Sequence, residues 1–208
     1  LRAVVTGSSS GIGRAILTEF ANAGAAVVAH ANRSFVDAET LAEGLSRSGA
    51  RAYALQADLT DPSACERLVQ RAFETLGGVD VWVNNAGADI LTDGKHDLSY
   101  AEKLETLLQV DVRATVMLTR DVGARMRAVG DGTIINIGWD QALTGMEDVP
   151  FVEWKSAGFR DFEHEAFDPE LKRNLQWTIH ELTTSAQLHV EARVMHHCAG
   201  PETGRDST

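Results

Sequence analysis

The sequence predicts an α/β fold, a doubly wound parallel sheet with six strands. One observation is that short, continuously apolar segments alternate along the chain with segments of helical periodicity. This alternation is typical of a parallel sheet with helices covering both faces. The other is that the first apolar segment, residues 3–5, runs directly into the glycine-rich stretch Gly7–Gly13. A strand, a glycine turn and a helix start in this order are typical of dinucleotide-binding folds.

Each expected element has a local signal. Short apolar runs predict strands at residues 3–5, 25–29, 52–57, 79–83, 133–137 and 192–197. Apolar residues at helical spacing predict helices at 11–23, 36–47, 63–76 and 104–126. Asp61 followed by Pro62 predicts the start of the third helix, because Asp is a favoured N-cap and proline fits the first helical position. Gly77 and Gly130 are expected to end the third and fourth helices.

Composition limits the possible partners. With 208 residues, the chain is expected to form a single dinucleotide-binding domain over 1–208, with an atypical segment over 156–191 where the patterns weaken. The formal net charge of −11 argues against nucleic acid and anionic membranes. No apolar run approaches the ~18 residues of a membrane span, and no signal peptide is evident at the start. Cys65 and Cys198 lack metal-site spacing, so we expect no metal and a cytoplasmic protein with two buried thiols.

The glycine-rich stretch predicts a phosphate cradle. Backbone N–H groups of such a turn can approach a pyrophosphate, and the dipole of the following helix favours its charge. Gly7 is expected to permit the turn, Gly11 to allow close approach of the phosphates, and Gly13 to let the helix pack on the strand. The predicted contacts are Gly7, Ser9, Ser10, Gly11, Ile12 and Gly13.

Three motifs together resemble the short-chain dehydrogenase/reductase family, whose domain is a Rossmann fold. They are Thr6-Gly7-x-x-x-Gly11-Ile12-Gly13, Asp58-Leu59 after the third strand, and Asn84-Asn85-Ala86-Gly87 after the fourth. The resemblance is close over about residues 3–137 and patchy afterwards, and we expect the family's last strand to be missing. Alone, the Asn-Asn-Ala-Gly run would also fit a tight turn with side-chain caps.

The resemblance implies further contacts to the cofactor. Asp58 and Leu59 would bind the adenine side, and Asn85, Ala86 and Gly87 would line the adenosine ribose. Val110 and Lys155 complete this predicted set of cofactor contacts. The family also implies a homo-oligomer formed through the helix at 104–126 and the helix after Lys155.

The residues after the second strand favour NADP(H) over NAD(H). An NAD site usually has an acidic residue there for the ribose 2′-hydroxyl, and Asn32-Arg33-Ser34 contains none. Arg33 and Ser34 instead suit a 2′-phosphate, to which arginine makes charge-assisted hydrogen bonds. The alternative is that Arg33 is a solvated loop cation.

The catalytic residues that the resemblance implies are mostly replaced. The family uses a Tyr-x-x-x-Lys motif, in which the lysine lowers the pKa of the general acid/base tyrosine, together with a serine and an asparagine. Here Phe151 takes the place of the tyrosine, Gly138-Trp139 stands where the serine is expected, and Asp111 replaces the asparagine. Lys155 is retained.

Asp140, just past the fifth strand, is a candidate replacement acid, because a carboxyl group desolvated at that position would have a raised pKa. The alternative is that Asp140 caps a loop. Lys155, Asp140 and Asp111 are therefore the predicted catalytic residues.

These patterns predict a short-chain-type oxidoreductase with a non-standard or impaired catalytic site. It would transfer a hydride between NADP(H) and the carbonyl or alcohol group of a small-molecule substrate. One alternative is a non-catalytic NADP(H)-binding sensor or partner subunit. A second is a structural subunit without cofactor, against which the intact glycine turn weighs.

Overall fold

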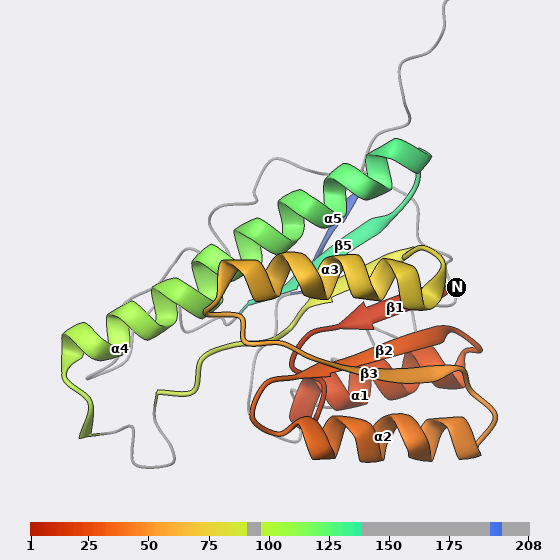
Figure 1. Ribbon diagram of the computed structural model, residues 1–208, viewed down its shortest axis with the longest axis horizontal. Coiled ribbons are helices and arrows are strands. Elements are labelled where there is room, and N and C mark those ends of the chain that lie inside the picture. The colour runs from red at the N-terminus through yellow and green to blue at the C-terminus, as the bar shows by residue number, and fades with distance from the viewer. Residues whose placement is uncertain (91–96, 139–191, 197–208) are drawn as a thin grey trace, which may run out of the picture.

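The computed structural model of the chain describes residues 1–90, 97–138 and 192–196 (Figure 1). Its elements in chain order are β1 (Arg2–Val5), α1 (Gly11–Asn22), β2 (Ala26–Ala31), α2 (Phe35–Arg47), β3 (Ala52–Gln56), α3 (Pro62–Leu76), β4 (Val81–Asn84), α4 (Tyr100–Leu107), the π-helix η2 (Leu108–Ala114), α5 (Thr115–Val129), β5 (Thr133–Ile137) and β6 (Ala192–His196). No described helix is both long enough and apolar enough to cross a bilayer.

The strands form one sheet in the order β3-β2-β1-β4-β5-β6. Strands β1 to β5 run parallel, with Val4 of β1 level with Val28 of β2 and Trp82 of β4. The chain winds outward from β1 to β3 and then returns to place β4 on the other side of β1. The switch point of the sheet therefore lies between β1 and β4, where ligands of such folds bind at the carboxyl ends of the strands.

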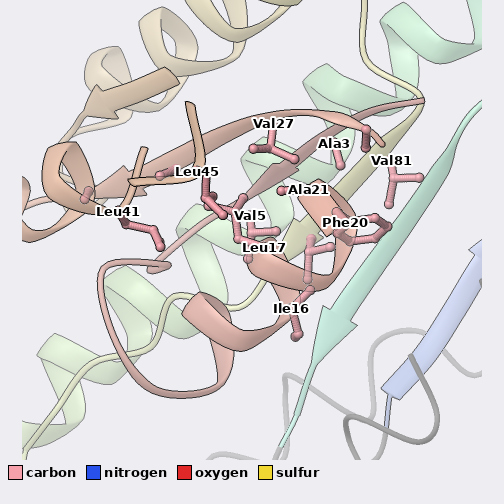
Figure 2. Close-up of a cluster of buried hydrophobic side chains, with 14 of the residues drawn as sticks. Ala3, Val5, Ile16, Leu17, Phe20, Ala21, Val27, Leu41, Leu45 and Val81 are labelled. Atoms are coloured by element: carbon pink, nitrogen blue, oxygen red, sulfur yellow. The ribbon is translucent and has the colours of Figure 1, made fainter. Parts of the chain in front are cut away.

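Two apolar layers hold the helices against the sheet. Side chains alternate across β1, so that Ala3 and Val5 face one layer while Val4 faces the other. The first layer joins β1 and β2 to α1 and α2 around Phe20, which is fully buried (Figure 2). The second joins the opposite face to α3 and α5 around Trp82, also fully buried. Figure 1 shows α1 and α2 on one side of the strands and α3 on the other.

The predicted fold class is confirmed, and the termini of α3 follow the predicted chemistry. The Asp61 side chain accepts a hydrogen bond from the backbone N–H of Ser63 at 2.9 Å, and Gly77 ends the helix with a left-handed φ of 68°. The sixth strand is present, but it pairs antiparallel with β5, whereas a wholly parallel sheet was expected. An antiparallel edge strand is common on otherwise parallel sheets. Residues 139–191, which connect β5 to β6, lie outside the described residues.

The helix predicted at 104–126 differs from expectation in its interior. It begins at Tyr100, where Ser99 and Glu102 form a capping box, and ends at Gly130 in a left-handed conformation. Between these ends the seven residues of η2 interrupt the α-helical hydrogen bonding of α4 and α5. Apolar periodicity alone does not reveal a π segment, because composition is unchanged by one extra residue in a turn.

Candidate functional site

The loops after four neighbouring parallel strands form the candidate site at the carboxyl edge of the sheet. They are the glycine turn after β1, Asn32–Ser34 after β2, Asp58-Leu59 after β3 and Asn85–Gly87 after β4. The sequence predicted cofactor contacts in all of these loops, and the sheet order brings the loops together. No group of three or more potential metal-ligating side chains occurs among residues 1–90 and 97–138.

The glycine turn is shaped by close backbone approach. Gly7 has a φ of 64°, and a Cβ atom there would lie 2.8 Å from the Cα of Ala86. Gly11 has a φ of 54°, and a Cβ atom there would have no neighbour within 4 Å, so the space in front of it is open. A Cβ on Gly13 would collide with the Asn85 amide and lie 2.5 Å from the Gly7 carbonyl oxygen. Gly13 therefore allows α1 to lie close against the turn and Asn85, while α1 also packs on β1 in the first apolar layer.

Hydrogen bonds from Thr6 and Asn85 lock the turns after β1 and β4 together. The Thr6 hydroxyl oxygen accepts from the backbone N–H groups of Asn85 and Ala86, both at 3.0 Å. In return, the Asn85 side-chain amide donates to the carbonyl oxygens of Thr6 at 2.9 Å and Gly7 at 3.0 Å. The sequence motifs include Thr6 and assign Asn85 and Ala86 to the cofactor site, but they gave Thr6 no role of its own. The sequence feature that points to a role for Thr6 is its position at the end of a strand, directly before Gly7.

The three serines of the turn have different environments. Ser8 is fully buried, and its hydroxyl donates to the carbonyl of Val5 at 2.8 Å. Ser9 is buried, whereas Ser10 is exposed. Ser10 is the N-cap of α1, but its side chain makes no capping hydrogen bond. Its hydroxyl and the first N–H groups of α1 are therefore presented together at the positive end of the helix dipole.

His30 of β2 is a buried side chain that sequence reasoning did not assign. Its Nδ1 accepts from the Gly7 backbone N–H at 3.2 Å, and its Nε2 lies 3.2 Å from the Ala57 carbonyl oxygen. Burial lowers the pKa of His30 to about 4, although the hydrogen bond to the Ala57 carbonyl acts in the opposite direction. The ring is therefore neutral at neutral pH. A lone histidine within an apolar strand was the only sequence signal.

The ends of β2 and β3 lie beside the glycine turn, on the β1 side of the switch point. Asn32 is half-buried, while Arg33 and Ser34 are exposed. Hydrogen bonds from the Thr60 backbone and hydroxyl lower the pKa of Asp58, and the Asn32 amide and the Arg33 charge lower it further. Asp58 is thus an exposed, ionised carboxylate close to Asn32 and Arg33. The neighbouring residue Leu59 is buried in the second apolar layer.

The π-helix η2 carries two predicted site residues into contact with these loops. Val110 and Asp111 are half-buried there, and the Asp111 Oδ1 accepts from the backbone N–H of Ala88 at 3.0 Å. Arg113 in the same segment donates to the Thr60 carbonyl at 2.6 Å, next to Asp58. A carboxylate can only accept hydrogen bonds, so Asp111 does not supply the donor that an asparagine amide would.

Side chains of β4, β5 and α5 form a buried polar network. The Asn84 side chain accepts from the Trp82 indole N–H at 2.8 Å and donates to Asn136 at 2.8 Å and Thr119 at 3.0 Å. These contacts join β4 to β5 and α5. The predicted catalytic residues Lys155 and Asp140, together with Phe151 and Trp139, lie outside the described residues.

Comparisons with known proteins agree with this fold. A family model described as short chain dehydrogenase matches residues 2–151. The chain is 37% identical over 138 residues to a short chain dehydrogenase of Pseudocercospora fijiensis, a match covering 65% of this chain and 43% of that protein. It is 34% identical over 136 residues to a fatty acyl-CoA reductase of Mycobacterium tuberculosis, covering 65% of this chain and 46% of the relative.

Among solved structures, a short chain dehydrogenase from Burkholderia cenocepacia in complex with NADP superposes with a TM-score of 0.53 at 37% identity. That match covers 60% of this chain and 50% of the other. The chain thus matches about half the length of these known proteins.

We predict that Gly13→Ala disturbs the site while a matched glycine change does not. A Cβ at Gly13 has no space, and overpacking of this kind costs about 1–3 kcal/mol of unfolding free energy. Gly44 is a helical glycine of α2 with nothing within 4 Å, so Gly44→Ala should stabilise the protein by about 0.5–1 kcal/mol. Urea unfolding and dinucleotide titration measure both effects. Equal behaviour of the two variants would contradict the proposed packing of the turn.

The burial of His30 predicts a pH-dependent loss of stability. The pKa of its ring is about 4 in the folded protein against 6.5 for an unperturbed histidine, so the unfolded chain binds the proton more readily. Stability should therefore fall as the pH drops from 6.5 toward 4, by up to about 3 kcal/mol. Urea unfolding of the wild type and of His30→Asn across this window tests the prediction. The variant should show a shallower pH dependence, and parallel curves would exclude His30 as the cause.

Proposed function

The chain belongs to the short-chain dehydrogenase family, and we propose that it is an oxidoreductase acting on a small-molecule substrate with NADP(H). The reaction would move a hydride between the nicotinamide and a carbonyl or alcohol group. The observation that carries the proposal is the open, hydrogen-bonded glycine turn at the switch point of the sheet. The positive φ at Gly7 and Gly11 would strain any other residue there, and a side chain at Gly13 would collide with its neighbours. The turn therefore presents backbone atoms alone where a phosphate would approach.

The residues present fit a dinucleotide. The open space at Gly11 and the uncapped N-terminus of α1 suit a pyrophosphate, with the Ser10 hydroxyl beside them. Asp58 would hydrogen-bond the adenine with the buried Leu59 packed nearby, and Asn85 to Gly87 would line the adenosine ribose. The bound nicotinamide would supply the hydride donor or acceptor, and the protein would supply orientation and electrostatics.

Arg33 supports the choice of NADP(H). It is exposed at the end of β2, and the carboxylate whose pKa its charge lowers, Asp58, belongs to the loop after the next strand. Arg33 and Ser34 would hold the 2′-phosphate, with Asn32 fixing the loop between them and Asp58. The NADP complex of the Burkholderia cenocepacia relative is consistent with this choice.

In the catalytic half we propose roles for Lys155, Asp111 and Asp140. Lys155 would hold the nicotinamide ribose. Asp111, fixed by the Ala88 N–H, would face the same region from η2 and accept hydrogen bonds only. Asp140 would compensate only in part for the missing tyrosine as a proton donor. The alternative of an NADP(H)-binding sensor or partner subunit follows if none of these groups moves a proton.

We also propose that the protein is a cytoplasmic homo-oligomer. The described free thiol, Cys65, is buried, and burial raises its pKa to about 11, which suits an unreactive structural thiol. The helix formed by α4, η2 and α5 exposes large apolar side chains, with Tyr100 at 60% and Val116 at 51% exposure. A second copy packed along this helix would cover them.

We predict that Arg33→Ala weakens NADP(H) binding by about tenfold or more, because it removes a charge-assisted contact to the 2′-phosphate. NAD(H) affinity should stay the same. Arg47→Ala, at the far end of α2, makes the same charge change away from the loop and serves as the control. Calorimetric titration of each variant with both cofactors decides. Tighter binding of NAD(H) by the wild type, or no effect of Arg33→Ala, would refute the cofactor assignment.

We predict that sedimentation at micromolar protein concentration shows an oligomer, and that Val116→Glu shifts it toward the monomer. A charge placed in an apolar interface loses its hydration without gaining a partner. Val36→Glu is the matched control, because Val36 is 72% exposed on α2, away from the proposed interface. A monomeric wild type, or an equal effect of both changes, would argue against this interface.

We predict slow or absent turnover on ordinary ketones despite intact cofactor binding. A positioned general acid typically contributes about 10²–10⁴-fold to the rate, and the usual tyrosine is absent. Introducing the family's tyrosine and serine by Phe151→Tyr together with Trp139→Ser should raise kcat measured by NADPH oxidation. Asp140→Asn is the counter-test. If it abolishes a robust wild-type activity while NADPH still binds, Asp140 is the replacement acid and the catalytic site is not impaired.

A further inference from the structure

His30 connects the two loops that a dinucleotide must contact at the same time. It lies near the end of β2 with 2% of its surface exposed, and both nitrogens of its ring are engaged. Nδ1 accepts the backbone N–H of Gly7, at the start of the glycine turn. Nε2 contacts the carbonyl of Ala57, the residue directly before Asp58.

The partners of the ring define its tautomer. A backbone N–H can only donate, so Nδ1 of His30 must be unprotonated. A backbone carbonyl can only accept, so Nε2 must carry the proton. The ring is therefore a rigid, neutral bridge with a donor at one end and an acceptor at the other.

The backbone of His30 holds the same turn a second time. Its N–H donates to the Ser8 hydroxyl oxygen at 3.0 Å, and its carbonyl accepts from the Ser8 N–H at 2.9 Å. Two successive residues of the turn, Gly7 and Ser8, are thus attached to one residue of the neighbouring strand. The Nε2 end of the ring contacts Ala57, the residue directly after β3.

We propose that His30 is a positioning residue for the cofactor, which holds the glycine turn at a fixed separation from the loop at 57–59. The inference rests on the proposed function, in which the turn binds the pyrophosphate and the loop at 57–59 binds the adenine. A ligand that spans both loops gains affinity when their separation is already correct before it binds. A ligand that touches only the adenine side gains nothing from the bridge.

Three variants separate the two ends of the bridge. His30→Asn places an amide oxygen near the position of Nδ1 and keeps an acceptor for the Gly7 N–H. His30→Gln reaches the position of Nε2 and keeps a donor for the Ala57 carbonyl. His30→Leu removes both contacts at similar volume. Thr119→Val is the matched control, because it removes a half-buried partner of Asn84 away from the turn.

The test is calorimetric titration with NADPH, which spans both loops, and with adenosine 2′-monophosphate, which reaches only the adenine side. We expect His30→Leu to weaken NADPH binding by about tenfold, the equivalent of one lost hydrogen bond in the preorganised site. The affinity for adenosine 2′-monophosphate should not change. The Asn and Gln variants each keep only one of the two contacts, so they should lose NADPH affinity too. This should hold even where thermal unfolding shows that they are more stable than His30→Leu. Thr119→Val should lower stability and leave both affinities unchanged.

The opposite results overturn the proposal in distinguishable ways. Unchanged NADPH affinity in the three variants, or an equal loss for both ligands, would make His30 an ordinary core residue. Full recovery of NADPH affinity by either Asn or Gln would show a one-ended contact instead of a bridge. If His30→Leu does not fold, the Asn and Gln variants carry the comparison. A wild-type protein that binds neither nucleotide contradicts the proposed function itself.

Discussion

The hydroxyl group of Thr6 is the contact on which the candidate site depends. It accepts two backbone N–H groups from the turn after β4 and donates to the carbonyl of Val83 at 3.3 Å. The strand order reverses between β1 and β4, so helices leave the two strands in different directions and a crevice opens there. Strands β1 and β4 are paired up to this point, and a further link is needed to join the turns that follow them. Thr6 and Asn85 supply the link, and the close contact between Gly7 and Ala86 follows from it.

The parts of the fold that sequence predicted are those determined by local chemistry. The Asp61 N-cap, the left-handed glycines at 77 and 130 and the glycine turn each depend on residues within a few positions of one another. Their signals are therefore complete within a short window. The same holds for the buried strands, because both faces of a parallel sheet are covered and their sequences are mostly apolar.

The features that sequence missed depend on contacts between distant segments. Thr6 meets residues about 80 positions away, and His30 joins positions 7 and 57. The π-helix η2 was also missed, since one extra residue in a turn changes the helix face by about 100° without altering composition. Its Asp111 meets Ala88, and its Arg113 meets Thr60. Both contacts tie η2 to loops that are unrelated to it in sequence.

The residues proposed to bind the cofactor and those proposed to move a proton lie mostly in different parts of the chain. The contacts that shape the glycine turn, from Val5 to Ala86, arise within the first 90 residues. The proposed proton donor and the retained lysine belong to a later stretch, and Asp111 is the one predicted catalytic residue that the described helices position. Substitution of the tyrosine and serine leaves these hydrogen bonds of the turn untouched, because their donors and acceptors all precede Gly87. Cofactor binding could thus persist in a chain whose proton transfer is changed, a combination that stays a prediction from the sequence.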